Sequence, residues 1–509
     1  MRPRLALACQ RQRVTLAERV IANMVLMGKE KCVRRIAGDV ITKTHRSLPI
    51  VLSAVMAIAA CATPSEKSVE ARPSAPAAIP KAPPPTQQEP VAPATRGEAA
   101  DEARKARPNY PCANFYKSGY RPTIGFDKTP PPPLGKPKKG VVFADPVYRT
   151  CIVRVTDAAH EPMPTFARVD YARRQLFNAD DSLLLIYAVD GSWHVYDVRT
   201  QKYLKKLRGI GGDAEPYWHP KDPNRLLFLP NNGGMAIYEL DVSTNENRAI
   251  VDFSQPDAKG LRVRDLWPEA ARIWTRSEGS PSSDGRYWAF QVETDDFKML
   301  GMFTYDMQTH AIVGTYKTTV RPDHVTMSPT GLYVFVAWDE GGTEGGPTVF
   351  TRDLQRRWPL HVPLGHNDLA LDEYGDDMLV SVDHTHGYVY MIRLKDRLMT
   401  RLYPIWINDT TMAMHFSGKA FNKPGWVLVS TFGNGKTEWP HQKVFALQLR
   451  KNPKIVHLMH HRGAVTTYFA QPQASVNRDF TRFVVNSNWG APGDANVDTY
   501  MAEIPRDGF

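Results

Sequence analysis

The sequence predicts an all-β fold, a seven-bladed β-propeller that occupies residues 141–509. From about residue 141, short apolar runs alternate with Gly, Pro, Asp and Asn turns, and helical patterns are nearly absent. One unit recurs seven times: a turn, an apolar strand of four to six residues, a polar loop and a second strand. The copies begin near residues 177, 218, 280, 328, 372, 421 and 476. Because one four-stranded sheet cannot bury both of its faces, seven such units are expected to close into a ring.

The strand that closes this ring is expected upstream of the first complete unit. Residues 150–156 (TCIVRVT) form a short apolar run there. They either complete the last blade or form an early strand of the first one. The all-β pattern excludes an α/β hydrolase and a Rossmann enzyme.

Residues 1–60 have the pattern of a bacterial lipoprotein signal peptide. Basic residues precede an apolar run of 13 residues, 48–60, which is too short to span a bilayer but suits a signal peptide. The run ends in the letters IAAC, which resemble a lipobox. Cys61 is therefore expected to carry a lipid anchor to the membrane. The alternative is an ordinary signal peptide with a chance cysteine.

Two neighbouring features refine this prediction. Ala62 follows the cysteine, and by resemblance to Gram-negative lipoproteins this favours the outer membrane. A leader of 60 residues is long, so Met24 or Met27 is a more natural start.

The net charge of +11 does not indicate a nucleic-acid partner. Residues 1–60 hold 11 Lys and Arg but only 3 Asp and Glu, whereas the remainder holds 53 and 50. Most of the basic excess therefore lies in the leader. The remainder also lacks a basic stripe with interleaved aromatic residues, so no nucleic-acid binding is expected.

Two segments separate the leader from the propeller. Residues 61–108 begin with the lipidated Cys and continue as a Pro/Ala-rich linker with ten prolines. This linker has too little apolar sequence to offset its ordering entropy and is expected to be a disordered tether. Residues 109–140 are still Pro-rich but contain several aromatic residues, so we expect an ordered arm across the domain.

Five cysteines are present, and three of them lie in residues 1–61. The other two are Cys112 and Cys151. In an exported domain this pair suggests a disulfide that joins the arm to the first strand. Two separate buried thiols are an equally acceptable interpretation.

The units SPSSDGRYWAF and SPTGLYVFVAW resemble blades of the Tol-system periplasmic propeller and of oligogalacturonate lyases. The resemblance covers roughly residues 141–509. It implies a seven-bladed propeller that binds ligands in the funnel at one end of its channel. The lyases cleave uronate chains by β-elimination, and the resemblance places their ligand-binding side chains on the innermost strand of each blade.

The corresponding positions in this sequence are polar and recur at one phase. They are Glu215, Tyr217, His219, Arg276, Glu278, Asp323, His324, His366, Asp368, His415, Tyr468, Gln471 and Gln473. Polar groups that repeat at one phase do not suit a buried strand, because each must find a partner. A water-lined channel would remove this conflict.

Two functions are open. In the first, the protein is non-catalytic and binds a glycan, another cell-envelope component or a protein partner; Glu215, His219, His366, Gln471 and Gln473 would then be ligand-binding residues. In the second, it is a polysaccharide lyase that acts on uronate-containing glycans, and the catalytic candidates are His415, His324, Arg276 and Tyr468. Such a lyase needs a base near neutral pKa and a cation that neutralises the uronate carboxylate.

The channel histidines are candidate metal ligands, but they do not identify one metal. Neutral imidazoles suit Mn, Zn or Ni. The lyase resemblance implies a Gln-x-x-His-x-His metal motif, and the nearest match here is Tyr468-x-x-Gln471-x-Gln473. A divalent Mn ion stays possible only through channel histidines from different blades.

Overall fold

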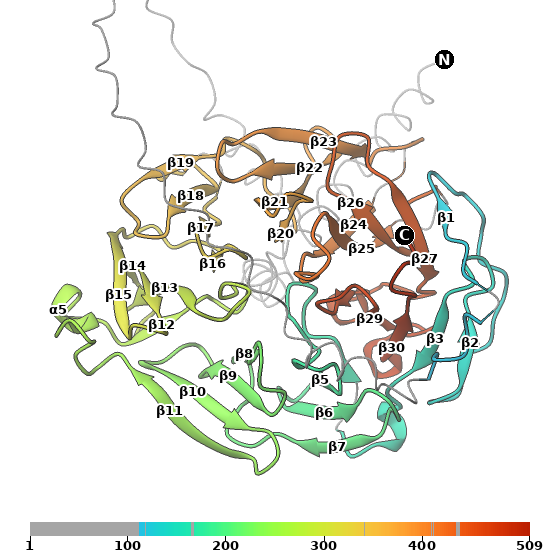
Figure 1. The fold of residues 1–509 in the computed structure, drawn as a ribbon, viewed down its shortest axis with the longest axis horizontal. Coiled ribbons are helices and arrows are strands. Elements are labelled where there is room, and N and C mark those ends of the chain that lie inside the picture. Colours follow the sequence, from blue (N-terminus) through green and yellow to red (C-terminus); the bar gives the residue numbers. More distant parts are fainter. Residues whose placement is uncertain are drawn as a thin grey trace, which may run out of the picture. The chain divides into compact units, whose positions relative to one another are not determined.

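The computed structural model is a ring of β-sheets around a central axis (Figure 1). It describes residues 111–509 except 118, 164–166, 340, 341, 409, 411 and 434–437. These described residues contain seven sheets, each built from one repeat unit and its flanking strands. The predicted seven-bladed β-propeller is thereby confirmed. The predicted leader, Cys61 and the tether lie outside the described residues.

Blades 1 to 5 are four-stranded antiparallel sheets whose strands follow the chain from the centre outward. Blade 1 contains β4 (Ala167–Arg168), β5 (Leu183–Ala188), β6 (Trp193–Asp197) and β7 (Tyr203–Lys206). Blade 2 contains β8 (Glu215–Trp218), β9 (Arg225–Leu229), β10 (Ala236–Asp241) and β11 (Glu246–Asp252). Blade 3 contains β12 (Arg272–Trp274), β13 (Tyr287–Glu293), β14 (Met299–Asp306) and β15 (Ala311–Lys317). Blade 4 contains β16 (Val325–Met327), β17 (Tyr333–Val336), β18 (Thr348–Thr351) and β19 (Arg357–Pro359). Blade 5 contains β20 (Asn367–Leu371), β21 (Asp377–Asp383), β22 (Tyr388–Arg393) and β23 (Met399–Pro404).

Blades 6 and 7 recruit strands from the N-terminal side of the first unit. Blade 6 contains β24 (Met412–Ser417), β25 (Trp426–Gly433), β26 (Lys443–Gln448) and β27 (Ile455–His460), with β1 (Thr123–Ile124) added to its outer edge. Blade 7 contains β28 (Ser475–Val476), β29 (Arg482–Ser487), β30 (Asp498–Glu503), β3 (Cys151–Arg154) and β2 (Val142–Ala144). The helical elements in the described residues are α5 (Val263–Leu266), η1 (Ala158–His160), η2 (Tyr468–Ala470) and η3 (Asp494–Asn496). No helix among the described residues is long and apolar enough to cross a membrane.

Blade 7 closes the ring by pairing the two ends of the domain. Strand β3 runs antiparallel to β30, with Cys151 opposite Glu503 and Arg154 opposite Tyr500. The predicted strand at residues 150–156 therefore completes the last blade, which is one of the two positions expected for it. This arrangement prevents the first and last blades from separating without breaking a sheet.

The hydrophobic core lies between adjacent blades, and for this reason the middle strands are apolar on both faces. Every residue of β21 and of β29 is buried. Between blades 2 and 3, Phe290 packs against Phe253, Phe303 and Trp288. Continuous apolar runs, rather than strict alternation, therefore mark the blade strands in the sequence.

The arm lies along the outer edges of blades 6 and 7. Strand β1 pairs with β27, and a disulfide joins Cys112 to Cys151 with a Cα–Cα distance of 6.1 Å. The Tyr116 hydroxyl donates to the carbonyl of Glu503 over 2.6 Å and accepts from the Cys151 amide over 2.8 Å. Strand β1 therefore covers the outer edge of blade 6, which would otherwise expose unpaired backbone groups, while Tyr116 and the disulfide attach the arm to blade 7.

The inner strands of blades 1 and 3 are interrupted by bulged segments. In blade 1, eight residues lie between Arg168 and Phe177, whereas two lie between their partners Tyr187 and Leu184. We call residues 169–176 the blade 1 inner segment. In blade 3, residues 275–281 bulge in the same way between the pairings of Trp274 with Gln291 and Ser282 with Tyr287; we call them the blade 3 inner segment.

The blade 1 inner segment fills the centre of the ring. Its side chains reach blades 3, 4 and 6, which are not adjacent to blade 1: Arg174 donates to the Ser277 carbonyl, Arg173 contacts His324, and Gln175 donates to the Lys419 carbonyl. Arg173 and Arg174 of this segment thus bond groups across the channel axis, where a water-filled channel had been expected.

Candidate functional site in the central channel

The polar positions gather mainly at one end of the channel. In each blade the innermost strand (β4, β8, β12, β16, β20, β24 or β28) begins a series of strands that continues outward along the chain, so all inner strands run in the same direction along the channel. Asp323, His366 and Gln473 each directly precede or lie near the start of an inner strand. They therefore lie at the same end, which we call the entrance end. His219 follows the last residue of β8 and lies at the opposite end.

The first group at the entrance end is the histidine–glutamine cluster, His366, His415, Gln471 and Gln473. The His366 and His415 rings stack with their centroids 4.3 Å apart. His415 Nε2 donates to Gln471 Oε1 over 2.7 Å, and Gln473 Nε2 donates to the same oxygen over 3.4 Å. Gln473 has a positive φ of 44° and its Oε1 accepts from the Ala172 amide. The two amides at the start of the last blade thus hold each other and a histidine.

One atom of this cluster has no bonding partner. His415 is 1% exposed, and its Nδ1 is buried without a hydrogen bond among the described residues. Because Nε2 carries the proton given to Gln471, Nδ1 holds a free lone pair. The cluster therefore contains one imidazole lone pair that no described residue uses.

The second group is the arginine cluster, Arg173, Glu278, Asp323 and His324. Arg173 Nη1 lies 3.0 Å from His324 Nε2, and Arg173 forms an ion pair with Glu278. His324 Nδ1 lies 3.3 Å from Asp323 Oδ2 and 3.8 Å from Glu278 Oε2. His324 is 1% exposed, whereas the side chain of Asp323 is 61% exposed. The cluster thus extends from a buried imidazole to a solvent-facing carboxylate.

Tyr171 connects the two clusters. Its ring meets the His415 ring edge-on with centroids 5.6 Å apart. The Arg173 guanidinium lies 4.8 Å from the centre of the same ring and donates to the Tyr171 hydroxyl over 3.3 Å. Burial raises the pKa of Tyr171 to about 12, and the charges of Tyr468 and Asp323 contribute to this shift. Both of these residues therefore lie within electrostatic reach of Tyr171.

The histidines at the entrance end are neutral at physiological pH. Burial lowers the pKa of His324 and of His366 to about 4, and it lowers the pKa of His415 well below its ordinary value. The positive charge of Arg173 contributes to all three shifts. For Asp323, desolvation is outweighed by the hydrogen bond with His324 and by Arg173 and Arg276, which hold the pKa of this carboxyl below its usual range.

Arg276 and Tyr468 form part of the solvent-facing rim. Arg276 Nη1 donates to the Pro322 carbonyl over 2.7 Å and lies 3.8 Å from Asp323 Oδ1. Tyr468 is 39% exposed, and the Arg168 guanidinium lies 5.7 Å from the centre of its ring. Both side chains are thus held by neighbours yet remain open to solvent on one side.

Glu215 and His219 have structural contacts. The Glu215 carboxylate is fully buried and accepts the backbone amides of Thr275 and Ser277. His219 Nδ1 accepts the amides of Lys221 and Asp222 in the turn after β8. The structure therefore brings neither side chain to the two clusters, although both had been predicted as ligand-binding residues.

Sequence analysis did not identify Arg173, Arg174 or Tyr171. They lie in the stretch DYARRQ, upstream of the first repeat unit, which reads as a polar loop. The adjacent pair of arginines was the available signal, because two consecutive guanidinium groups are unusual next to a buried strand.

The metal motif implied by the lyase resemblance does not fit these residues. Gln471 Oε1 already accepts from His415 and Gln473, and Gln473 Oε1 accepts a backbone amide. Their remaining amide nitrogens are donors and cannot bind a cation. A metal held at Gln471 would have to displace one of the two donors bonded to its oxygen.

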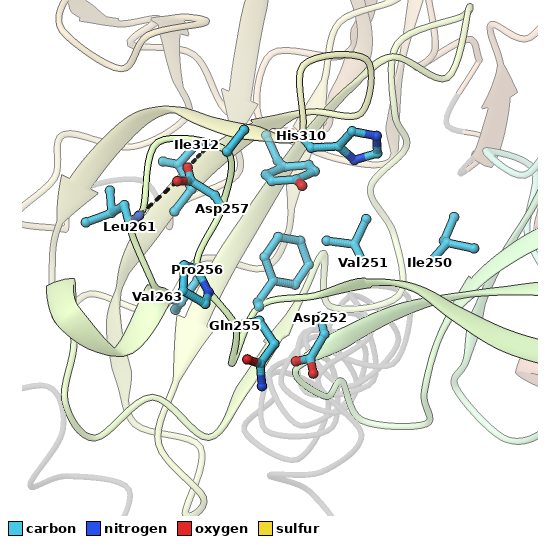
Figure 2. A pocket seen from close by; sticks show the side chains of 13 residues that line it. Ile250, Val251, Asp252, Gln255, Pro256, Asp257, Leu261, Val263, His310 and Ile312 are labelled. Atoms are coloured by element: carbon cyan, nitrogen blue, oxygen red, sulfur yellow. Dashed lines mark hydrogen bonds between the residues drawn. The ribbon is translucent and has the colours of Figure 1, made fainter.

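A separate pocket lies at the outside of the ring, between blades 2 and 3. It has a volume of about 330 Å³ and lies next to β11 and β15. Figure 2 shows Val251, Leu261 and Val263 along its wall, with Asp257 bonded to the amides of Leu261 and Ile312. It shares no residue with the entrance end.

Solved structures with similar folds are also propellers. The oligogalacturonate lyase of Vibrio parahaemolyticus matches with a TM-score of 0.49 and 12% identity, over 75% of this chain and 97% of the other. An oligogalacturonate lyase in complex with manganese matches with a TM-score of 0.49 and 13% identity, over 76% and 98%. The Neurospora crassa Pan2 WD40 domain matches with a TM-score of 0.41 and 15% identity, over 69% and 94%. No protein-family model and no curated protein matches the chain.

Proposed function

We propose that this protein is a lipid-anchored β-propeller of the cell envelope that binds a glycan at the entrance end of its channel. The observation that carries this proposal is the solvent-facing rim of Arg276, Asp323 and Tyr468 above the buried histidines. Their side chains are 34%, 61% and 39% exposed, respectively. Sugar recognition uses a few fixed polar groups together with an aromatic face, and the rim contains both kinds of side chain.

The proposed location rests on the sequence. An apolar run that ends at Cys61, followed by a Pro-rich tether, suits a lipoprotein held away from a membrane surface. Ala62 favours the outer membrane of a Gram-negative bacterium. Other envelope components and protein partners are the competing ligands for the same rim.

Binding can be tested by calorimetric titration of the full chain with neutral and acidic envelope glycans. Asp323→Asn and Tyr468→Ala are expected to weaken binding at least tenfold. Matched controls are Asp222→Asn and Tyr374→Ala, because both residues lie in turns after inner strands, at the opposite end of the channel, and Tyr374 is 81% exposed. The proposal fails if no glycan binds, or if the rim variants bind as tightly as the controls. A glycan-negative result combined with rim-dependent capture of a purified envelope protein would assign the rim to a protein partner.

A second candidate function is a polysaccharide lyase, and the free lone pair on His415 Nδ1 favours it. A β-elimination needs a base for the proton alpha to the uronate carboxylate and a cation for that carboxylate. His415 supplies a neutral lone pair for the first role, although burial lowers its pKa below the near-neutral value expected of such a base, and Arg276 suits the second role through bidentate pairing. The test follows the ultraviolet absorbance of the unsaturated uronate product on a panel of uronate polysaccharides. His415→Ala is expected to abolish a rise seen with the wild type, and a panel without any rise removes this candidate.

A further inference from the structure

We propose that Glu278, Asp323 and His324 form a binding site for a divalent transition-metal ion and that Arg173 competes with the ion for Glu278 and His324. This inference does not depend on the glycan proposal. It also differs from the metal motif implied by the lyase resemblance, which falls on blade 7.

The three residues bring their donor atoms to one point from two blades. One ligand atom of each lies within 4.8 Å of the other two, and no other such trio of His, Cys, Asp or Glu occurs in residues 111–509 as far as the structure describes them. Atoms bound to one ion at about 2.0–2.2 Å from it lie up to roughly 4.4 Å apart. Small rotations of Asp323, which faces solvent, would therefore complete the set.

Arg173 now occupies this position. Its guanidinium contacts Glu278 and His324 and reaches the Tyr171 hydroxyl. Its Nε is buried without a hydrogen bond among the described residues, and Glu278 Oε2 has an ion-pair contact but no hydrogen bond. An unsatisfied buried N–H costs free energy, and this guanidinium stands where a cation is electrostatically favoured.

The position of the ring proton on His324 links binding of the metal ion to the position of the Arg173 guanidinium. Arg173 Nη1 donates to Nε2, which leaves the ring proton on Nδ1, facing the carboxylates. Binding a metal through Nδ1 requires the proton to move to Nε2. That nitrogen can take it only after the guanidinium leaves. Metal binding therefore displaces Arg173 toward its remaining partner, Tyr171.

The ligand set selects the class of ion. Two carboxylates and one imidazole suit Mn²⁺ or Zn²⁺, with water in the open positions. Ca²⁺ prefers six to eight oxygen ligands and is not expected to bind here. Asp323 at the solvent-facing side provides the path of entry.

The experiment titrates Mn²⁺ into the full-length chain after treatment with a chelator and follows the free-ion signal by electron paramagnetic resonance. One saturable site is expected, with Zn²⁺ competing and Ca²⁺ failing to compete. Asp323→Asn and His324→Ala should weaken binding at least tenfold, and Arg173→Gln should strengthen it at least tenfold because it frees two ligands and removes a positive charge. His310→Ala, an exposed histidine in the turn between β14 and β15, is the control.

Each outcome decides the proposal. His324→Ala could unfold the chain because His324 is buried, so Asp323→Asn, at an exposed side chain, provides an independent result. Circular dichroism establishes that each variant is folded. The proposal is overturned if neither the wild type nor Arg173→Gln binds Mn²⁺, or if Asp323→Asn binds as tightly as the wild type. Equal losses in His310→Ala and His324→Ala would show surface binding only and would also overturn it.

Discussion

Removal of the disulfide between Cys112 and Cys151 is expected to lower the thermal stability of the propeller measurably. The bridge spans 39 residues of sequence and joins the arm to β3, the strand that closes the ring. In the chain-entropy model a loop of this length restricts the unfolded chain by about 4 kcal/mol. For a domain of roughly 400 residues, the unfolding entropy converts this into a decrease in Tm of about 5 °C.

The change to make is the double variant Cys112→Ser with Cys151→Ser. Differential scanning calorimetry at several scan rates compares it with oxidised wild type, and wild type treated with a reductant serves as a second perturbation. Both are expected to melt about 5 °C lower. Because Tyr116 still bonds Glu503 and the Cys151 amide, the arm should remain docked at room temperature, and the near-ultraviolet spectrum should be retained.

The reasoning would be refuted if oxidised wild type and the double variant melted within about 1 °C of each other. That result would mean that the arm separates before the cooperative transition, so that the bridge no longer constrains the state that unfolds. A decrease much larger than 5 °C would instead show that ring closure through β3 depends on the arm.

Three further predictions concern other parts of the chain. Burial, with the charge of Lys443, lowers the pKa of His457 to about 4, whereas in the unfolded chain this histidine takes up its proton below about pH 6.5. The stability that this group contributes is therefore complete above pH 6.5 and is lost as pH falls toward 4. In denaturation experiments at pH 7, 6 and 5, His457→Gln should reduce the pH dependence of the free energy of unfolding by up to about 1.4 kcal/mol per pH unit. Phe290→Ala should cost about 3–5 kcal/mol in the free energy of unfolding because the ring is fully buried, and a comparable loss in Phe297→Ala, whose side chain is 38% exposed, would contradict this explanation. Cys61→Ser should move the protein from the membrane fraction to the soluble fraction and remove the acyl mass, and unchanged partitioning would disprove the lipid anchor.

The repeats made the fold predictable because the strands of every blade begin and end at corresponding positions of the repeat unit. Turns such as the Ser-Pro and Asp-Gly pairs and the apolar runs after them recur at a spacing that four antiparallel strands require. The same logic located the closing strand, since an apolar run upstream of the first unit had to pair somewhere. The periodic pattern could not show which blade this strand joins, because the pairing of the two chain ends is decided only when the ring closes.

The site was predicted less completely because position on an inner strand does not determine a side chain's partner. Glu215 has the same phase as the channel residues, yet it bonds backbone amides of the blade 3 inner segment. Arg173 has no counterpart in the repeat, because it lies on a bulged segment. Bulges add residues that the periodic pattern does not contain. Arg173 is such a residue, and it contacts Glu278 and His324 at the centre of the site.

The bulged segments also change what a ligand must do to bind. A water-lined channel offers its polar groups freely, whereas here many of them already have hydrogen-bond or ion-pair partners, and each broken pair costs free energy unless the ligand replaces it. Asp323 and Tyr468 at the rim can be reached without such exchange, but His324 and Glu278 can be reached only if Arg173 moves. The rim therefore governs initial binding, while the arginine cluster selects for ligands or ions that can take the place of a guanidinium. Binding at the two levels should consequently be separable by mutation: Tyr468→Ala is expected to alter glycan affinity alone, Arg173→Gln affinity for the cation, and Asp323→Asn both, because Asp323 belongs to both levels.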